Sequence, residues 1–152
     1  MENKKLYLIA CVAGLVCLMV YLPALTCDFI NFDDPEYVIE NTAIRSMGTE
    51  FWHWAFYTIP LNYWTPLLWI SFAIDFKLWG LNPFGYHLTN IILHAVTTVL
   101  LVVFADKVYV LSGCIMEYRR SRFIYPGILL AAGFLFALHP ARVESVVWVT
   151  ER

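Results

Sequence analysis

A run of 21 uncharged residues from Leu6 to Thr26 constrains this chain more than any other feature. As a helix rising about 1.5 Å per residue it covers roughly 32 Å, enough to cross a hydrocarbon core of about 30 Å. The composition agrees, because 61% of the 152 residues are hydrophobic and 14% are charged, against about 25% charged in soluble domains. These values argue against a soluble globular fold and leave nucleic-acid binding without an electrostatic basis.

Two more uncharged stretches follow, 28 residues at Leu78–Ala105 and 19 residues at Phe123–Ala141. We predict transmembrane helices at about 6–26, 84–106 and 123–140. The third stretch carries small residues that let helices approach closely in lipid, namely Gly127, Ala131, Ala132 and Gly133. A cleaved signal peptide is the alternative for the first stretch. However, the apolar part of this stretch is longer than the apolar region of a signal peptide, which is usually about 7–15 residues.

The segment from Phe51 to Ile74 is also uncharged, yet its composition argues against a fourth span. Pro60 and Pro66 would break a continuous helix. Aromatic side chains of the kind that settle at headgroup level are dense here: Trp52, Trp54, Tyr57, Tyr63, Trp64 and Trp69. We therefore predict amphipathic helices lying along the interface, within an outer loop at 27–83.

The distribution of charge gives the orientation. With three spans, Lys4 and Lys5 share a side with Lys107, Arg119, Arg120 and Arg122, and the positive-inside rule makes that side cytoplasmic. Four spans would place the arginine cluster outside. The stretch from Asp28 to Lys77 has seven acidic and two basic residues, a net charge of −5, and faces a periplasm or lumen. We expect an all-α integral membrane protein whose residues 1–152 form a single domain with a cytoplasmic N-terminus.

The acidic motif Asn31-Phe32-Asp33-Asp34-Pro35-Glu36-Tyr37 follows the outer end of the first span. Helix initiation explains part of it, with Asp34 as N-cap, Pro35 at the first helical position and Glu36 in the first turn. Asp33 is not needed for that purpose. A carboxylate in a partly dry cleft at the membrane surface holds a proton more readily, which suits a general base acting on an alcohol. Asp33 and Asp34 are therefore our candidate catalytic residues.

Two further polar groups lie near the outer ends of the other spans. His87, Asn90 and His94 share one face of the second span, where polar side chains either serve function or join helices. The histidines are two turns apart, about 11 Å, so we expect no metal site. Pro140 ends the third span beside the remaining candidate substrate-binding residues, namely His139, Arg142 and Glu144. An interfacial arginine can clamp a phosphate, although anchoring of the helix end is the alternative.

Four stretches in register resemble the N-terminal membrane region of multispanning proteins with tetratricopeptide repeats. These proteins include transmembrane O-mannosyltransferases and bacterial relatives, which are similar to the GT-C glycosyltransferase superfamily. The matching residues are Asn31-Phe32-Asp33-Asp34 with Tyr37, Trp64-Thr65-Pro66-Leu67 with Ser71-Phe72 and Asp75, Leu78–Asn90 with Leu93-His94, and Phe136–Pro140 with Val143–Val146 and Trp148-Val149.

The resemblance implies transfer of a sugar from a polyprenyl-phosphate donor to a protein hydroxyl. Asp33 would be the base, Asp34 its partner or the cap, and Arg142 and His139 would contact the donor phosphate. Membrane lipid, the lipid-linked sugar and a protein acceptor are the implied partners, and no cofactor is expected. Because relatives continue into more spans and into repeats of about 34 residues, we expect an N-terminal portion that is incomplete alone.

Two alternatives belong to other classes. One is a small non-enzymatic membrane protein or assembly subunit that associates through its glycine- and alanine-rich third span. The other is a transporter, which is disfavoured because the chain lacks paired intramembrane charges and inverted repeats. For localisation we expect the bacterial inner membrane rather than the endoplasmic reticulum.

Overall fold

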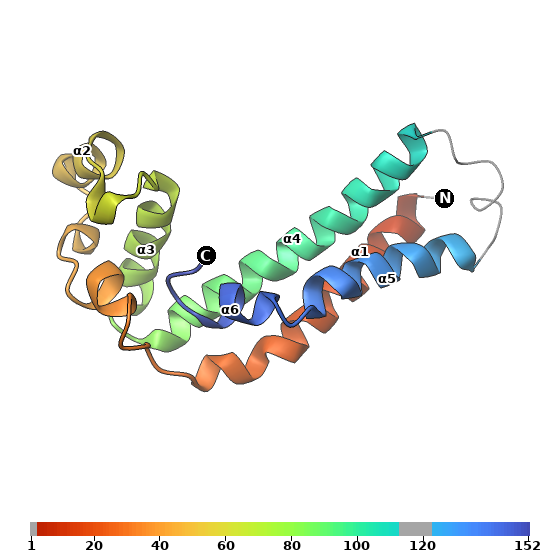
Figure 1. Ribbon diagram of the computed structural model, residues 1–152, viewed down its shortest axis with the longest axis horizontal. Coiled ribbons are helices and arrows are strands. Elements are labelled where there is room, and N and C mark those ends of the chain that lie inside the picture. Colours follow the sequence, from red (N-terminus) through yellow and green to blue (C-terminus); the bar gives the residue numbers. More distant parts are fainter. Residues whose placement is uncertain (1–2, 113–122) are drawn as a thin grey trace.

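The computed structural model describes residues 3–112 and 123–152, and all regular secondary structure in these ranges is helical. Three helices form an elongated bundle, and the chain between the first two of them forms a separate head (Figure 1). The bundle consists of α1 (Asn3–Tyr21), continued by the 3-10 turn η1 (Leu22–Thr26), with α4 (Pro83–Leu111) and α5 (Ile124–Leu138). The head consists of η2 (Pro35–Ile39), η3 (Ala43–Arg45), α2 (Thr49–Tyr57), η4 (Pro60–Asn62) and α3 (Pro66–Trp79), and α6 (Arg142–Val147) follows the bundle.

Small and aliphatic side chains bring α1, α4 and α5 together along their length. One core cluster consists of Leu6, Ala10, Ala13, Val102, Tyr125 and Leu129. A second, nearer the head, consists of Cys17, Tyr21, Ala24, Ile91, Ala95, Ala137 and Val146. Many other apolar side chains of the three helices point outward and are exposed. Such a surface suits a lipid environment.

Two helical segments, Asn3–Thr26 and Pro83–Leu111, are long and apolar enough to span a membrane. They match the first two predicted spans. Helix α5 has 15 residues, about 22 Å, which is shorter than a hydrocarbon core of about 30 Å. The third span therefore stays a prediction, and Arg119, Arg120 and Arg122 lie outside the described residues.

Gly133 of α5 lies against both α4 and α1, and its replacement should separate the three helices. A Cβ atom there would lie 2.8 Å from Val102 and 3.0 Å from Ala13, whereas at Gly127 it would meet nothing within 4 Å. We expect Gly133→Leu to lower the free energy of unfolding by about 1–3 kcal/mol through overpacking. Thermal unfolding in detergent checks this, with Gly127→Leu on the same helix as the control. Equal losses for both variants would contradict a tight contact at Gly133.

The head is built on a buried aromatic core. Trp69 and Phe72 of α3 are fully buried and pack with Phe51 of α2 and Val38 of η2. The break predicted from Pro60 and Pro66 is confirmed, since α2 ends at Tyr57 and α3 begins at Pro66. The predicted position of α2 and α3 along a membrane interface stays a prediction.

A tight corner joins the head to the bundle. Helix α3 ends at Gly80, whose φ of 60° is a conformation that glycine adopts without strain. The Asn82 side chain then caps α4 by accepting a hydrogen bond from the Phe84 backbone, and Pro83 occupies the first position of the helix. The Tyr86 hydroxyl donates back to the Gly80 carbonyl at 2.9 Å. These contacts fix the direction in which the head leaves α4.

Candidate functional site

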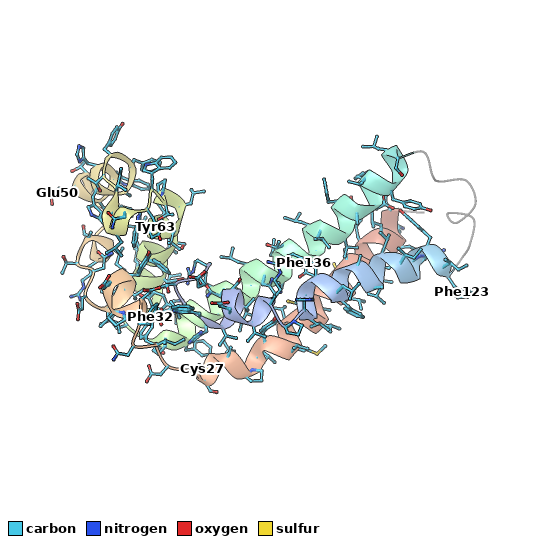
Figure 2. The ribbon with its side chains drawn as sticks, viewed as in Figure 1. Cys27, Phe32, Glu50, Tyr63, Phe123 and Phe136 are labelled. Carbon is cyan, nitrogen blue, oxygen red and sulfur yellow. The ribbon has the colours of Figure 1, made fainter. Side chains whose placement is uncertain are left out.

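The acidic motif and Asn90 both contact the segment that follows α6, where the head meets the bundle. Phe32 of the acidic motif lies where the head meets the bundle (Figure 2). Its ring is 5.7 Å from the ring of Trp148, which follows α6, between centroids. The Asn90 amide of α4 donates to the Trp148 carbonyl at 3.0 Å. Residues 31–37, the start of α4 and the end of α6 are therefore neighbours in space.

The acidic motif forms a wide helical turn. The Tyr37 backbone N–H donates to the Asp33 carbonyl at 3.0 Å, and the Glu40 N–H donates to the Pro35 carbonyl at 2.8 Å. The second bond joins residues five apart, a geometry frequent at functional sites. Asp33 is half-buried at the start of this turn, so its carboxylate stays within reach of a ligand.

Asp34 is arranged differently from our expectation. It does occupy the N-cap position, with Pro35 at the first helical position and Glu36 in the first turn, but its side chain makes no capping hydrogen bond. Instead Oδ2 accepts from the Ile30 backbone N–H at 2.8 Å, and the side chain is completely buried. The predicted side-chain cap is therefore wrong, because the carboxylate turns back to the Ile30 N–H rather than forward along the turn.

The surroundings of Asp33 are acidic and aromatic. Burial raises the pKa of the Tyr37 hydroxyl, and the nearby Asp33, Tyr63, Glu151 and Glu36 raise it further. Tyr37 therefore stays protonated at neutral pH, and its ring stacks on Trp69 at 5.2 Å.

A recess of about 420 Å³ adjoins this turn of the head. Glu36, Glu40 and Trp54 line it together with Asn41, Thr42, Ala43, Pro60 and Leu61, and none of these residues is basic. The recess therefore disfavours anionic ligands and suits neutral or cationic ones.

The histidines of α4 and Asn90 are buried within the protein. His87 is 1% exposed and Asn90 2% exposed, so neither faces an open surface. The Asn90 amide holds the chain after α6 through the Trp148 and Val149 carbonyls. His94 lies 3.1 Å from the Ala137 carbonyl through Nε2, and the Tyr21 hydroxyl donates to the same carbonyl. Asn90 thus joins α4 to the chain after α6, and His94 lies against α5.

The third group lies at the end of α5 and the start of α6. His139 is exposed, and its Nδ1 accepts from the Ala141 N–H at 3.2 Å. The Arg142 guanidinium lies 4.5 Å above the Phe136 ring and forms no ion pair within residues 3–112 and 123–152. Glu144 is exposed one turn into α6. The Arg142 guanidinium is therefore available to bind an anion. Glu144 lies on the surface of α6.

An apolar groove of about 430 Å³ begins beside His139. It is lined by Ala131, Phe134, Leu135, Leu138, His139 and Pro140. A hydrocarbon chain fits its composition, and Arg142 follows Pro140 by two residues.

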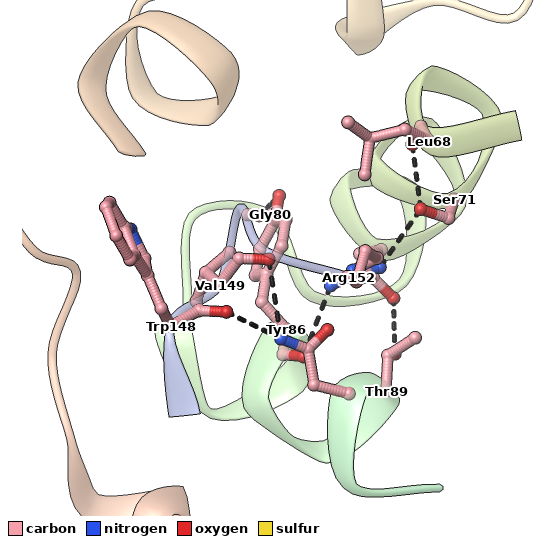
Figure 3. A network of polar contacts seen from close by, with 10 residues as sticks. Leu68, Ser71, Gly80, Tyr86, Thr89, Trp148, Val149 and Arg152 are labelled. Atoms are coloured by element: carbon pink, nitrogen blue, oxygen red, sulfur yellow. Dashed lines mark hydrogen bonds and ion pairs between the residues drawn. The ribbon is translucent and has the colours of Figure 1, made fainter. Parts of the chain in front are cut away.

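The structure adds a polar network that the sequence did not single out (Figure 3). Arg152 forms an ion pair with Asp75 at 2.6 Å, and the two side chains are 5% and 2% exposed. Thr89 donates to the other carboxylate oxygen at 2.6 Å. Arg152 also donates to the Ser71 hydroxyl and the Tyr86 carbonyl. This network joins α3, α4 and the segment after α6. The two ion-pair partners are 77 residues apart, so no local spacing could have revealed the contact.

Comparison with known proteins identifies relatives of similar sequence. The chain is 32% identical to human protein O-mannosyl-transferase TMTC4 over 153 aligned residues, which cover 93% of this chain. It is 31% identical to Drosophila melanogaster protein O-mannosyl-transferase Tmtc1 over 88% of this chain. Caenorhabditis elegans protein O-mannosyl-transferase F38B6.6 is 29% identical over 87% of this chain. The chain is a homologue of protein O-mannosyl-transferases.

The resemblance seen in the sequence is therefore confirmed. The chain spans 20%, 15% and 19% of the lengths of these three O-mannosyl-transferases. No protein-family model and no solved structure matches it. The alignments to the O-mannosyl-transferases extend over most of the chain, so they include both the head and the bundle.

Proposed function

We propose that this chain is part of a membrane-embedded glycosyltransferase that moves a sugar from a polyprenyl-phosphate donor to a protein hydroxyl. In this proposal three spans place the head on the non-cytosolic side, and further segments of the protein complete the donor site. The supporting observation is that Phe32 of the acidic motif and Asn90 near the start of α4 both contact Trp148 after α6, in a chain homologous to protein O-mannosyl-transferases.

The lipid-linked donor would bind at the end of α5. A polyprenyl phosphate combines a long hydrocarbon with an anionic head, and the apolar groove beside His139 matches the first part. Arg142 has no carboxylate partner in the described chain, so its guanidinium can pair with a phosphate oxygen. His139 also lines the groove and would contact the phosphate through its other ring nitrogen, Nε2.

The acceptor hydroxyl would bind at the helical turn of the acidic motif. Asp33 would take the proton from the acceptor hydroxyl as the oxygen attacks the anomeric carbon and the phosphate leaves. Glu36 and Glu40, which line the neighbouring recess, would repel the donor phosphate. The phosphate would therefore stay near α5, apart from the acceptor.

The test is a transfer assay with the full-length protein in liposomes. Polyprenyl-phosphate mannose and a nucleotide-linked mannose are offered in parallel with a serine- and threonine-rich polypeptide, and hexose addition is followed by mass spectrometry. We expect modification with the lipid-linked donor alone. Transfer from the nucleotide donor, or from neither, would contradict the proposal.

A further inference from the structure

Phe32 is an exposed aromatic residue inside the acidic motif. Its side chain is 70% exposed, and the residue directly precedes Asp33. Single exposed apolar side chains are common on protein surfaces, so exposure alone assigns no role. Phe32 is distinguished by its ring contact with Trp148, at 5.7 Å between centroids and 60° between the ring planes. We call these two residues the aromatic pair, and they join the acidic motif to the segment after α6.

Backbone hydrogen bonds hold both members of the aromatic pair. The Phe32 N–H donates to the Ile30 carbonyl at 2.8 Å, and the Trp148 N–H donates to the Glu144 carbonyl at 3.0 Å. The Trp148 carbonyl also accepts from the Asn90 amide at 3.0 Å. Phe32 thus presents an exposed ring whose support is in place before a ligand arrives, which lowers the entropic cost of binding.

Helix α6 sets the spacing between the aromatic pair and Arg142. Arg142 is the first residue of α6, and Trp148 directly follows the last. At about 1.5 Å per residue, these two residues lie about 9 Å apart along the helix axis. A hexose phosphate has a comparable length. A donor whose phosphate pairs with Arg142 can therefore place its sugar at the aromatic pair, where Phe32 adjoins Asp33 in the chain.

The chemistry of an aromatic ring decides which part of the donor fits the aromatic pair. The face of the ring is electron-rich and attracts weakly positive C–H groups. A hexopyranose presents C–H bonds on the faces of its ring, whereas an anionic phosphate is repelled by the same electron-rich surface. The hydrocarbon part already has the apolar groove beside His139. The sugar is therefore the part of the donor that suits this position.

We propose that Phe32, supported by Trp148, is the platform on which the sugar of the lipid-linked donor stacks. This inference rests on the proposed function, because it assigns a binding contact to the sugar within the same site. Phe32 exchanges no proton and forms no bond in the reaction. By holding one face of the sugar ring, it determines how the anomeric carbon is presented to an acceptor oxygen beside Asp33.

The experiment compares the binding of two lipids to the full-length protein, polyprenyl-phosphate mannose and polyprenyl phosphate without a sugar. We expect the wild type to bind the mannosylated lipid more tightly. Phe32→Ala should weaken binding of that lipid about 3- to 10-fold, the size expected for one aromatic contact, and leave binding of polyprenyl phosphate unchanged. Phe32→Leu, which keeps apolar bulk but lacks a ring face, should behave like Phe32→Ala. Phe32→Tyr should bind like the wild type.

Tyr57→Ala is the matched control. Tyr57 is an exposed aromatic residue of the head, 80% exposed, but its ring stacks on His53 of its own helix. Its replacement should change the affinity for neither lipid. If Phe32→Ala weakens binding of both lipids equally, or if Phe32→Leu keeps the full affinity for the mannosylated lipid, the platform is overturned.

The transfer assay separates failure of this inference from failure of the proposed function. A wild type that prefers the mannosylated lipid through Phe32 but transfers no sugar supports the platform and contradicts the proposed function. A wild type that transfers sugar, while Phe32→Ala keeps the same preference, overturns the platform alone. A wild type that binds both lipids equally also overturns the platform, whatever the transfer assay shows.

Discussion

Replacing Asp33 with asparagine in the full-length protein should lower the rate of sugar transfer by about 100- to 10,000-fold, the range that a general base contributes. The asparagine side chain has nearly the same shape as aspartate but cannot take the proton of an acceptor hydroxyl. The turn should survive, because it is held by the backbone carbonyl of Asp33 rather than by its side chain. Affinity for the lipid-linked donor should change little, since the groove and Arg142 lie on α5 and α6.

The measurement is kcat with polyprenyl-phosphate mannose, together with donor binding. Asp28→Asn is the matched control, because Asp28 has an exposed side chain in the same loop and accepts a hydrogen bond from the Phe29 N–H. Its rate should stay within about twofold of the wild type, as expected for a surface substitution. Undiminished transfer by the Asp33 variant would remove this residue from catalysis.

The buried ion pair gives the largest expected effect on stability. Asp75→Ala should lower the free energy of unfolding by about 3–5 kcal/mol, because it leaves the Arg152 guanidinium buried without a counter-ion. Burial lowers the pKa of Arg152 and the Asp75 carboxylate opposes that shift, so removal of Asp75 leaves only the unfavourable contribution. Thermal unfolding of the purified protein in detergent measures the loss.

A double variant distinguishes pairing from packing. Asp75→Leu combined with Arg152→Met removes both charges while keeping apolar volume against Phe72, over which the guanidinium now lies at 4.6 Å. We expect most of the stability to return, as for other buried pairs replaced by hydrophobic side chains. Glu40→Gln, on the exposed side of the head, should have almost no effect. A double variant as unstable as Asp75→Ala would show that the charges are not the cause.

The helices of the bundle could be predicted because each one is specified by residues that are close together in the sequence. Uncharged runs locate α1 and α4, and Pro66, Asn82-Pro83 and Pro140 mark helix boundaries through backbone chemistry. The predicted contact through small residues holds at Gly133 and not at Gly127, which is exposed. Composition identifies a small residue, but only the packing shows which face it occupies.

The sequence locates the segments that carry the polar residues of the candidate site. It is a poorer guide to the contacts that each of these residues makes. The sequence places His87 and Asn90 on one helical face, yet it does not show that the Asn90 amide binds the backbone after α6. It suggests a cap for Asp34, whereas the carboxylate accepts a hydrogen bond from the Ile30 N–H, on the N-terminal side of the turn. The pairing of Asp75 with Arg152 was missed because the two residues are 77 positions apart and meet only after the chain has folded.

The length of α4 has a consequence for how the head stands relative to a bilayer. Its 29 residues measure about 43 Å, so roughly 13 Å exceeds a hydrocarbon core of about 30 Å. The corner at Gly80–Tyr86 connects this rod directly to α3. In the proposed membrane orientation, part of α4 therefore extends beyond the hydrocarbon core, and any tilt of this helix would change the distance of the head from the lipid surface.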